Sequence, residues 1–178
     1  MAEKRRPDEN LILRMAQGDR EAFRLLYEQT SDAVYGFALS ILKHSQDAED
    51  VMHDVFLKVW QNADTYQPEG RPLSWILRIV RNQCYNRIRS GRKQDYEESP
   101  EIPDPGGQEA LLDRMVLEQA MRILDSAERQ IVILHALSGM KHREIAELLE
   151  LPVGTVLSKY NRSLKKLIKE LEGKGAIA

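Results

Sequence analysis

The stretch HREIAELLELPVGTVLSKYNRSL, from His142 to Leu164, determines which fold to expect for the end of this chain. Ile145, Ala146 and Leu149 recur at helical spacing, and the small side chain of Ala146 lets a second helix approach closely. A short turn at Glu150–Leu151 follows, and the next helix begins with small polar residues. This pattern predicts a helix-turn-helix, whose second helix can enter the major groove of DNA. A helical hairpin with a solvated basic face is the alternative.

The helix after this turn, expected over Val153–Glu172, has two contrasting faces when its residues are placed about 100° apart. The apolar residues fall in one arc: Val153, Val156, Leu157, Tyr160, Leu164, Leu167, Ile168 and Leu171. The opposite side carries Lys159, Arg162, Lys165, Lys166 and Lys169, with Thr155 and Ser158 near the amino end. We therefore expect one face to pack, with Leu157 at the edge of the core, and the other to meet phosphate.

Length and composition favour a globular protein over a disordered tail. The chain has 178 residues, of which 42% are hydrophobic and 30% charged, enough for two small domains. No stretch is apolar enough for a membrane span and the charged start lacks a signal-peptide core, so we expect a cytoplasmic protein. Cys84 is expected in the core, and the four histidines lack partner cysteines at zinc-ligand spacing. We therefore expect neither a metal nor a cofactor.

The net charge of −2 hides a strongly uneven distribution. Residues 71–93 hold seven basic residues and no acid, and residues 154–169 hold five lysines or arginines and no acid. Between Gln94 and Glu109 come six acids and no base, together with several prolines and glycines. That composition resists both helix and core, so we expect an acidic flexible linker over 94–108 between a domain at 1–93 and another at 109–178.

Elsewhere the apolar residues recur at helical spacing, and no alternation longer than four residues indicates a strand, so we expect an all-α fold. The expected helices are Asn10–Gln17, Arg20–Leu42, Ala48–Asn62, Leu73–Ser90, Glu109–Leu124, Ala127–Ser138, His142–Leu149 and Val153–Glu172. Asp125 with Glu128 resembles a capping box, Gly139 suits a C-terminal cap, and Pro152 suits a first helical position.

The helix expected over Leu73–Ser90 combines basic groups with an aromatic ring and an amide. Its buried side comprises Ile76, Leu77, Ile79, Val80, Cys84 and Ile88, and the opposite side comprises Arg78, Arg81, Asn82, Tyr85, Arg89 and Arg92. In opened DNA, cations follow the backbone, a ring stacks on an unpaired base and an amide hydrogen-bonds a base edge. The face suits single-stranded DNA, and an arginine-rich surface helix without a ligand is an equal alternative.

The helix after Gln46 presents acids beside a leucine. It turns Ala48, Val51, Met52, Val55, Phe56, Val59 and Trp60 inward, and Asp47, Asp50, Asp54, Leu57, Lys58 and Gln61 outward. This outer face suits protein docking, in which charge orients the partner and the leucine anchors it. Acids near a helix start also stabilise the helix dipole, which is the alternative explanation.

Three segments, in this order, resemble the extracytoplasmic-function group of bacterial sigma factors: DAEDVMHDVFLKVW (Asp47–Trp60), LSWILRIVRNQCYNRIR (Leu73–Arg89) after the loop DTYQPEGRP, and REIAELLELPVGTVLSKYNRSLKKL (Arg143–Leu167). The resemblance covers nearly the whole chain. It implies a non-enzymatic adaptor that binds RNA polymerase core, directs it to promoter DNA, and commonly has an anti-sigma factor as a partner. Two other classes remain open: a stand-alone helix-turn-helix regulator, and an interaction protein that binds polymerase without initiating transcription.

The resemblance also implies three sets of contacts. Docking on the clamp of the largest catalytic subunit of polymerase falls to Asp47, Asp50, Asp54, Leu57 and Lys58. Recognition of the minus-10 element, with capture of an unstacked base, falls to Tyr66, Arg71, Arg78, Arg81, Asn82, Tyr85 and Arg89. Recognition of the minus-35 element falls to Thr155, Ser158, Lys159, Arg162, Lys165 and Lys166.

Three residues depart from the pattern of that family. Leu157 stands where many members have a basic residue, Glu150 where the turn usually has glycine, and Lys141 where a serine often caps the helix. The last two changes are each expected to cost about 1 kcal/mol of local stability. The sequence has no phosphate-cradling glycine loop and no nucleophile paired with a base, so the energy for opening DNA is expected to come from binding.

Overall fold

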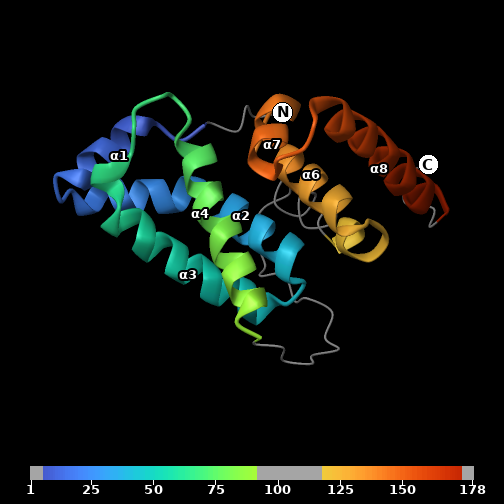
Figure 1. The fold of residues 1–178 in the computed structure, drawn as a ribbon, viewed down its shortest axis with the longest axis horizontal. Coiled ribbons are helices and arrows are strands. Elements are labelled where there is room, and N and C mark those ends of the chain that lie inside the picture. The colour runs from blue at the N-terminus through green and yellow to red at the C-terminus, as the bar shows by residue number, and fades with distance from the viewer. Residues whose placement is uncertain (1–5, 92–117, 174–178) are drawn as a thin grey trace. The chain divides into compact units, whose positions relative to one another are not determined.

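A computed structural model describes residues 6–91 and 118–173, which form two compact units on either side of residues 92–117 (Figure 1). Every regular element in these described ranges is helical, which confirms the all-α prediction. The linker expected over 94–108 lies outside the described residues, as does the first part of the helix expected over Glu109–Leu124, whose residues 118–123 are helical.

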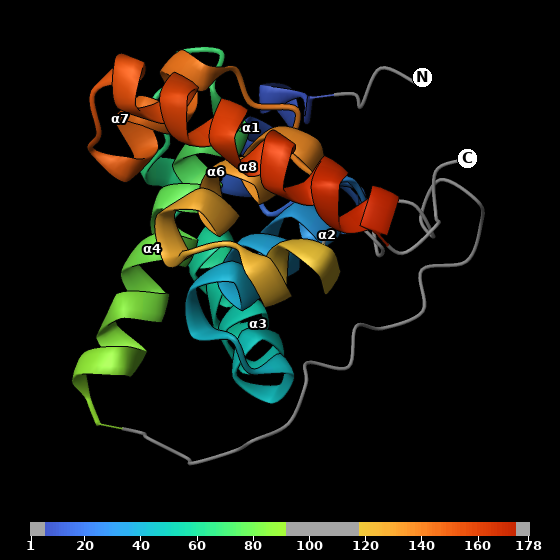
Figure 2. The same cartoon turned by 90° about the vertical axis from the view of Figure 1, so that its right-hand side faces the viewer.

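The N-terminal unit is built around one long helix. It comprises α1 (Glu9–Ala16), α2 (Arg20–Leu42), α3 (Ser45–Gln61), the short 3-10 helix η1 (Ala63–Thr65) and α4 (Pro72–Arg89). The helix α2 packs against α1, α3 and α4, and α3 also packs against α4 (Figures 1 and 2). Because every residue from Ala33 to Ile41 is buried, α2 is the central helix of this unit.

The joint between α1 and α2 depends on one carboxylate. Asp19 accepts hydrogen bonds from the backbone N–H groups of Glu21 and Ala22 at 3.0 and 3.1 Å. Its second oxygen accepts from Arg14 Nε at 2.8 Å. The acceptor satisfies N–H groups that a helix start leaves without a partner, and it also holds the end of α1.

The inner face of α3 follows the prediction closely. Ala48, Val51, Val55, Phe56 and Val59 are buried. Met52 and Trp60, also expected inside, are half-buried, and the Trp60 ring meets the edge of Phe23 at 5.5 Å between centroids. These two side chains therefore lie at the rim of the core.

The buried stripe of α4 differs from the prediction at the last turn. Ile76, Leu77, Val80 and Cys84 are buried, and burial raises the pKa of the Cys84 thiol to about 12. Ile88, expected in the core, is 52% exposed, so that prediction was wrong. The stripe continues instead to Arg87, seven residues after Val80 on the same side of the helix, where the guanidinium meets two carboxylates of α3.

In the C-terminal unit, α6 (Ser126–Ala136), α7 (His142–Leu149) and α8 (Val153–Gly173) each pack against the other two (Figure 2). Each helix contributes one ring to a shared cluster: His135 stacks on His142 at 4.8 Å, and Tyr160 meets both edge-on at 4.8 and 4.7 Å. Burial and the neighbouring His135 lower the pKa of His142. The neutral imidazole is therefore the form that suits the folded unit.

The ends of α6 match two of the three predicted caps. The Asp125 carboxylate accepts from the Glu128 N–H at 2.8 Å, and the Glu128 carboxylate accepts from the Asp125 N–H at 3.2 Å, which is the predicted capping box. Gly139 has φ +63° and donates to the His135 carbonyl at 3.1 Å. The third predicted cap, Pro152 at the start of α8, differs from the prediction. It precedes α8 rather than beginning it, and its carbonyl accepts from the N–H groups of Thr155 and Val156 at 3.0 and 3.1 Å.

The turn between α7 and α8 takes the geometry that usually requires glycine. Glu150 is left-handed, with φ 57° and ψ 42°. The Leu151 N–H donates to the Ala146 carbonyl at 3.0 Å and the Glu150 N–H to the Glu147 carbonyl at 3.4 Å, which closes the helix end. At the other end of α7, the Lys141 side chain provides no cap, and the Glu144 carboxylate accepts from the Lys141 N–H at 2.8 Å.

The packed side of α8 is rotated relative to the predicted arc. Val156, Ser163 and Leu167 are its buried residues, whereas Val153, Leu157 and Ile168 are 40%, 41% and 48% exposed. The expectation that Leu157 belongs to the core was therefore wrong. Lys159 and Lys166 lie on the flank of α8 that faces acids of α6, and Leu157 lies on the opposite flank.

Replacing Glu150 by glycine is expected to raise the stability of the C-terminal unit by about 1 kcal/mol, because glycine adopts the left-handed conformation without a steric penalty. Hydrogen exchange of the α7 and α8 amides in the full chain measures this effect. The matched control is Lys43→Gly at the end of α2, where φ is 61°; it should protect only the N-terminal unit. Unchanged or faster exchange in the Glu150→Gly variant would contradict the prediction.

Candidate functional site

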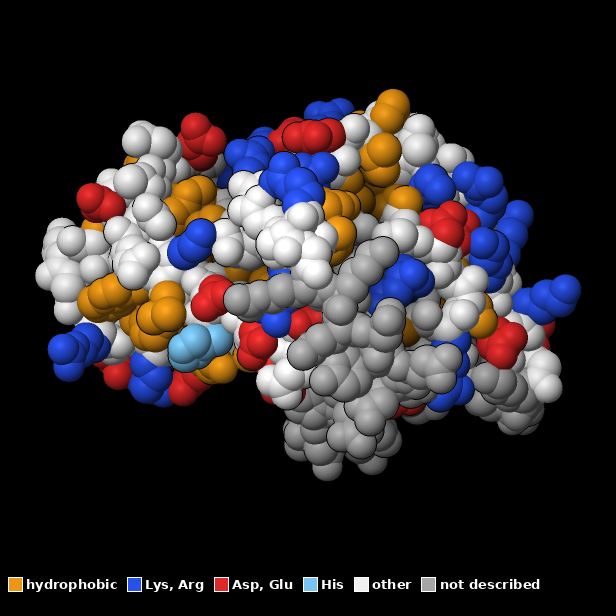
Figure 3. All heavy atoms as spheres, turned by 60° about the horizontal axis from the view of Figure 1, so that its bottom comes forward, with side chains coloured by type: hydrophobic (Ala, Val, Ile, Leu, Met, Phe, Trp, Pro, Cys, Tyr) orange, Lys and Arg blue, Asp and Glu red, His pale blue; other side chains and the backbone are white. Residues whose placement is uncertain are grey.

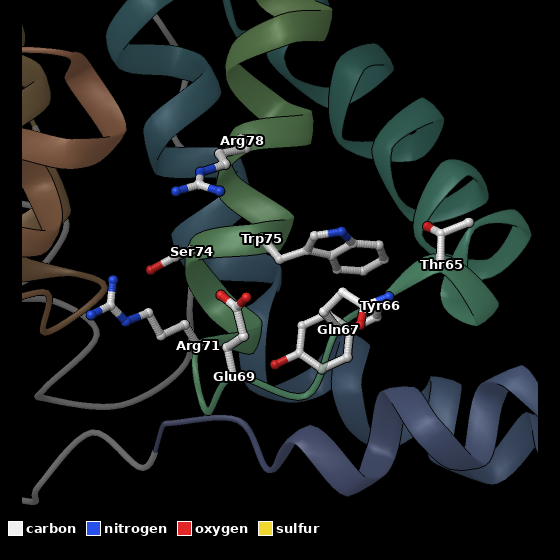
Figure 4. A pocket seen from close by; sticks show the side chains of 8 residues that line it. All are labelled: Thr65, Tyr66, Gln67, Glu69, Arg71, Ser74, Trp75 and Arg78. Carbon is white, nitrogen blue, oxygen red and sulfur yellow. The ribbon is translucent and has the colours of Figure 1, made fainter.

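A pocket of about 200 Å³ opens where α4 begins. Its lining comprises Thr65, Tyr66, Gln67, Glu69, Arg71, Ser74, Trp75 and Arg78. Figure 4 shows the Tyr66 and Trp75 rings on one side and the Arg71 and Arg78 guanidinium groups on the other. The rings pack edge to face with their centroids 5.3 Å apart. Flat apolar walls opposite cations suit a planar, electron-rich group attached to an anionic backbone.

The loop that forms this pocket is held by a residue far away in the sequence. Glu9, at the start of α1, accepts from the Tyr66 hydroxyl at 3.1 Å and from the Gly70 N–H at 2.8 Å. Burial, together with the bond to Glu9, raises the pKa of Tyr66 to about 12. Tyr66 is only 6% exposed, so its ring forms the wall of the pocket and its hydroxyl is already bonded.

The remaining residues of the predicted minus-10 set lie along α4, away from the pocket lining. Asn82, Tyr85 and Arg89 are exposed on successive turns, and Arg81 is half-buried with its guanidinium 5.4 Å from the centre of the Tyr85 ring. The structure thus brings Tyr66, Arg71 and Arg78 together in one pocket and leaves the other four along the outer face of the helix.

Several pocket residues were missed in the sequence. Trp75 and Ser74 lie inside the LSW segment, where their position at the first turn of a helix after a proline-containing loop was a usable signal. Glu9 had no such signal, because its partners are 57 and 61 residues away in the chain.

The acidic face of α3 is smaller than the sequence indicated. Asp50, Asp54, Leu57 and Lys58 are exposed, with Leu57 at 49%. Asp47 is half-buried and accepts from Arg87 Nε at 2.8 Å, and Arg87 Nη2 also donates to Asp50 at 2.9 Å. Burial is the largest single effect and opposes the charged guanidinium, but the hydrogen bonds and the charges of Asp47 and Asp50 together outweigh it, so the pKa of Arg87 is raised. Asp47 therefore has an internal partner.

The basic face of α8 is also divided. Lys159 Nζ lies 3.4 Å from an Asp125 oxygen, and Lys166 Nζ lies 2.7 Å from an oxygen of Glu128, whose side chain is 4% exposed. Burial is the largest single effect and would raise the pKa of Asp125, but the hydrogen bond from the Glu128 N–H and the charges of Lys159 and Lys166 together lower it.

Most of the other candidate residues of α8 face outward. Ser158, Arg162, Lys165 and Lys169 are exposed, and Thr155 is half-buried. Figure 3 shows Lys and Arg side chains gathered over the C-terminal unit, at the right of the view. Of the predicted minus-35 set, Ser158, Arg162 and Lys165 are thus exposed, and Lys166 is exposed but paired with Glu128.

The described residues provide neither a membrane-spanning helix nor a metal-binding cluster. None of their helices is long and apolar enough to cross a membrane. Within the same part of the chain, no group of three or more His, Cys, Asp or Glu side chains is placed to hold a metal ion.

Comparison with known proteins matches each unit to a named family segment. Sigma-70 region 2 matches residues 26–94, and Sigma-70 region 4 matches residues 114–167. The ECF RNA polymerase sigma factor SigK of Mycolicibacterium vanbaalenii is 30% identical over 169 residues, which cover 89% of this chain and 86% of that protein. This chain belongs to the extracytoplasmic-function sigma factors. As a sigma factor it directs RNA polymerase to promoters, which excludes the stand-alone regulator.

Other relatives of this sigma factor are similar along most of their length. The ECF RNA polymerase sigma factor SigW of Bacillus subtilis is 25% identical, and the match covers 90% of this chain and 94% of that protein. A solved structure of CnrH in complex with the cytosolic domain of CnrY matches with 25% identity and a TM-score of 0.66, covering 94% of this chain and 98% of the matched chain.

Removing the Glu9 carboxylate is expected to loosen the pocket of this sigma factor. In a Glu9→Ala variant, the Gly70 N–H and the Tyr66 hydroxyl lose their acceptor, so exchange of the Gly70 amide should accelerate roughly tenfold or more. Amide exchange followed by NMR measures this change. The matched control is Glu69→Ala, which removes a carboxylate from the same rim without removing that hydrogen bond. Equal exchange in both variants would refute the role of Glu9.

Proposed function

We propose that the two units of this sigma factor divide promoter recognition between them: the N-terminal unit docks on polymerase and recognises the minus-10 element, and the C-terminal unit recognises the minus-35 element. The boundaries proposed are 1–93 and 109–178, with 94–108 as the linker. The observation that carries this proposal is the pocket of aromatic rings and guanidinium groups at the start of the basic helix α4, in the unit that matches Sigma-70 region 2.

For polymerase docking, the exposed part of α3 supports an interface with an apolar centre. Leu57 projects beside Asp54 and Lys58, and Asp50 lies on the same face. An exposed leucine among charges provides burial for affinity and electrostatics for orientation. Asp47 contributes by holding Arg87, so its effect on docking is expected to pass through the position of α3 relative to α4.

A double variant, Asp54→Arg with Leu57→Ser, is expected to weaken binding of the full chain to core polymerase roughly 100-fold, because it reverses one charge and removes the apolar anchor. Both side chains are exposed, so the unit should stay folded, whereas changing Asp47 or Asp50 would disturb Arg87. Glu49→Arg provides the matched control: the same charge change on an exposed residue of α3 near Tyr35. Wild-type affinity in the double variant would reject this docking face.

For the minus-10 element, the pocket supports capture of one unstacked base of the non-template strand. Trp75 and Tyr66 offer ring surfaces against which a base can pack, and Arg71 and Arg78 offer cations to the adjoining phosphates. Arg81, Asn82, Tyr85 and Arg89 continue this surface along α4. Because a captured base is withdrawn from its pair, the binding free energy contributes directly to strand opening.

Base capture is tested with abasic nucleotides placed one at a time along a single-stranded minus-10 oligonucleotide. Wild-type holoenzyme is expected to lose roughly tenfold in affinity at one position, since stacking of a base is worth about 1–3 kcal/mol. Trp75→Ala, which removes one of the two rings proposed to pack against the base, should reduce that dependence on position. Arg89→Ala, in the last turn of α4, should weaken binding to every oligonucleotide equally and leave the dependence on position unchanged. A Trp75→Ala holoenzyme that keeps the wild-type dependence on position would count against the pocket.

For the minus-35 element, α8 supports insertion into the major groove as the second helix of the helix-turn-helix. Thr155, Ser158, Lys159 and Arg162 lie in its first half, and Lys165 and Lys166 one turn further on. The ion pairs of Lys159 and Lys166 with α6 favour a supporting role for these two lysines, at the edge of the interface.

Neither unit needs to bind DNA tightly, because polymerase and the linker raise the effective concentration of one contact once the other has formed. The protein therefore acts where polymerase and DNA are, in the cytoplasm, and uses binding energy rather than catalysis. The solved structure of CnrH contains the cytosolic domain of CnrY as its partner. The sigma factor RpoE of Bartonella quintana, which has a similar fold, is in complex with the anti-sigma factor NepR, and this supports an anti-sigma partner for this chain as well. Adding the purified chain to core polymerase with a library of duplex promoters tests the whole proposal: specific starts are expected, and their absence would overturn it.

A further inference from the structure

The outward face of α8 is not the purely basic surface that its composition indicates. With 3.6 residues per turn, Gly154, Ser158, Asn161 and Lys165 follow one line along the helix, at spacings of four, three and four residues. All four are exposed. Leu157, 41% exposed, flanks this line on one side, and Arg162 flanks it on the other. The centre of the face is therefore an amide next to an isobutyl group, with cations farther along and to one side.

The fold determines this arrangement through α6. Val156, Ser163 and Leu167 form the buried side of α8, and the ion pairs of Lys159 with Asp125 and Lys166 with Glu128 hold two lysines near that side. The face opposite the buried side is left to Asn161 and its neighbours. Gly154, at its amino end, has no side chain, and nothing lies within 4 Å of where a Cβ would stand, so another molecule can approach the backbone there.

The side chains on this face differ in which of their hydrogen-bond donors and acceptors remain available to a ligand. The Ser158 hydroxyl donates to the Thr155 carbonyl at 3.2 Å, and Arg162 Nε donates to the Ser158 carbonyl at 3.4 Å. The Asn161 amide makes no hydrogen bond to any described residue, so its donor and its acceptor are both free. An amide with both free matches the N6 donor and N7 acceptor of adenine in the major groove, and an apolar group matches the thymine methyl.

We propose that Asn161 and Leu157 determine the minus-35 specificity of this sigma factor, Asn161 by reading an adenine and Leu157 by contacting the methyl group of a neighbouring thymine. The inference rests on the proposed function of α8. The two residues are one helical turn apart, so they face adjacent positions in the groove. Arg162 and Lys165 lie next to them as exposed cations of the kind that contact phosphate, which favours DNA over an apolar protein as the occupant of this face.

The test uses reconstituted holoenzyme and a promoter library in which the minus-35 element is randomised. From the best promoter, each thymine is replaced by deoxyuridine, which lacks the methyl group, and each adenine by 7-deazaadenine, which lacks N7. Wild-type holoenzyme should lose transcription roughly fivefold or more at one adenine and measurably at an adjacent thymine. Asn161→Ala should remove the sensitivity to the adenine change, and Leu157→Ala the sensitivity to the missing methyl.

Lys165→Ala is the matched control, because Lys165 lies on the same line of α8 and is expected to contact phosphate rather than a base. It should weaken all promoters alike and lower the salt dependence of binding by about one phosphate contact. If wild-type holoenzyme starts specifically but both variants keep the wild-type base preferences, the inference is wrong while the proposed function stands. If the two variants bind core polymerase more weakly and keep the wild-type base preferences, the face contacts protein rather than DNA. If wild-type holoenzyme produces no specific transcription starts, the proposed function itself is overturned.

Discussion

Arg87 joins the two helices on which the N-terminal unit depends for recognition. Its guanidinium, with only 15% of the side chain exposed, bonds to Asp47 and Asp50 of α3 from the last turns of α4. A cation at this depth is tolerated because two carboxylates face it, and removing either side would leave a charge without a partner in a poorly solvated place. Because of this contact, Arg87 of the basic block and Asp47 of the acidic face are bonded to each other rather than available to a partner. The contact also links the helix proposed to contact polymerase to the helix proposed to contact DNA.

The C-terminal unit also has ion pairs that join its recognition helix to a neighbouring helix. Lys166 pairs with Glu128, which also closes the capping box of α6, and Lys159 pairs with Asp125 at the same helix start. Two cations of α8 thus help to fix the angle at which the helix-turn-helix presents its outer face. In each unit, then, charges that look like ligands in the sequence serve first to align the recognition helix. The surface left for a partner is narrower, and chemically more mixed, than the charge pattern alone indicates.

The pocket shows how distant parts of the chain combine at one site. Trp75 is positioned by α4, Tyr66 by the loop before it, and the loop by Glu9 of α1. A rigid wall favours capture of a base because little conformational freedom remains to be lost on binding. The first helix, which bears none of the residues assigned to promoter contact, therefore takes part in shaping the site through a single carboxylate.

The sequence by itself determined the helical class, the extent of most helices, the helix-turn-helix and the inner face of α3, because these depend on local propensity and on apolar periodicity. It also located the capping box at Asp125 and the unusual residue in the turn at Glu150. Only the tertiary structure decided which charged side chains remain available, because Arg87, Lys159 and Lys166 find their partners on other helices. The exposure of Leu157 and Ile88 was decided in the same way. Periodicity places a residue on a face, but the neighbouring helix determines which face is covered, and that neighbour is set by packing across the whole unit.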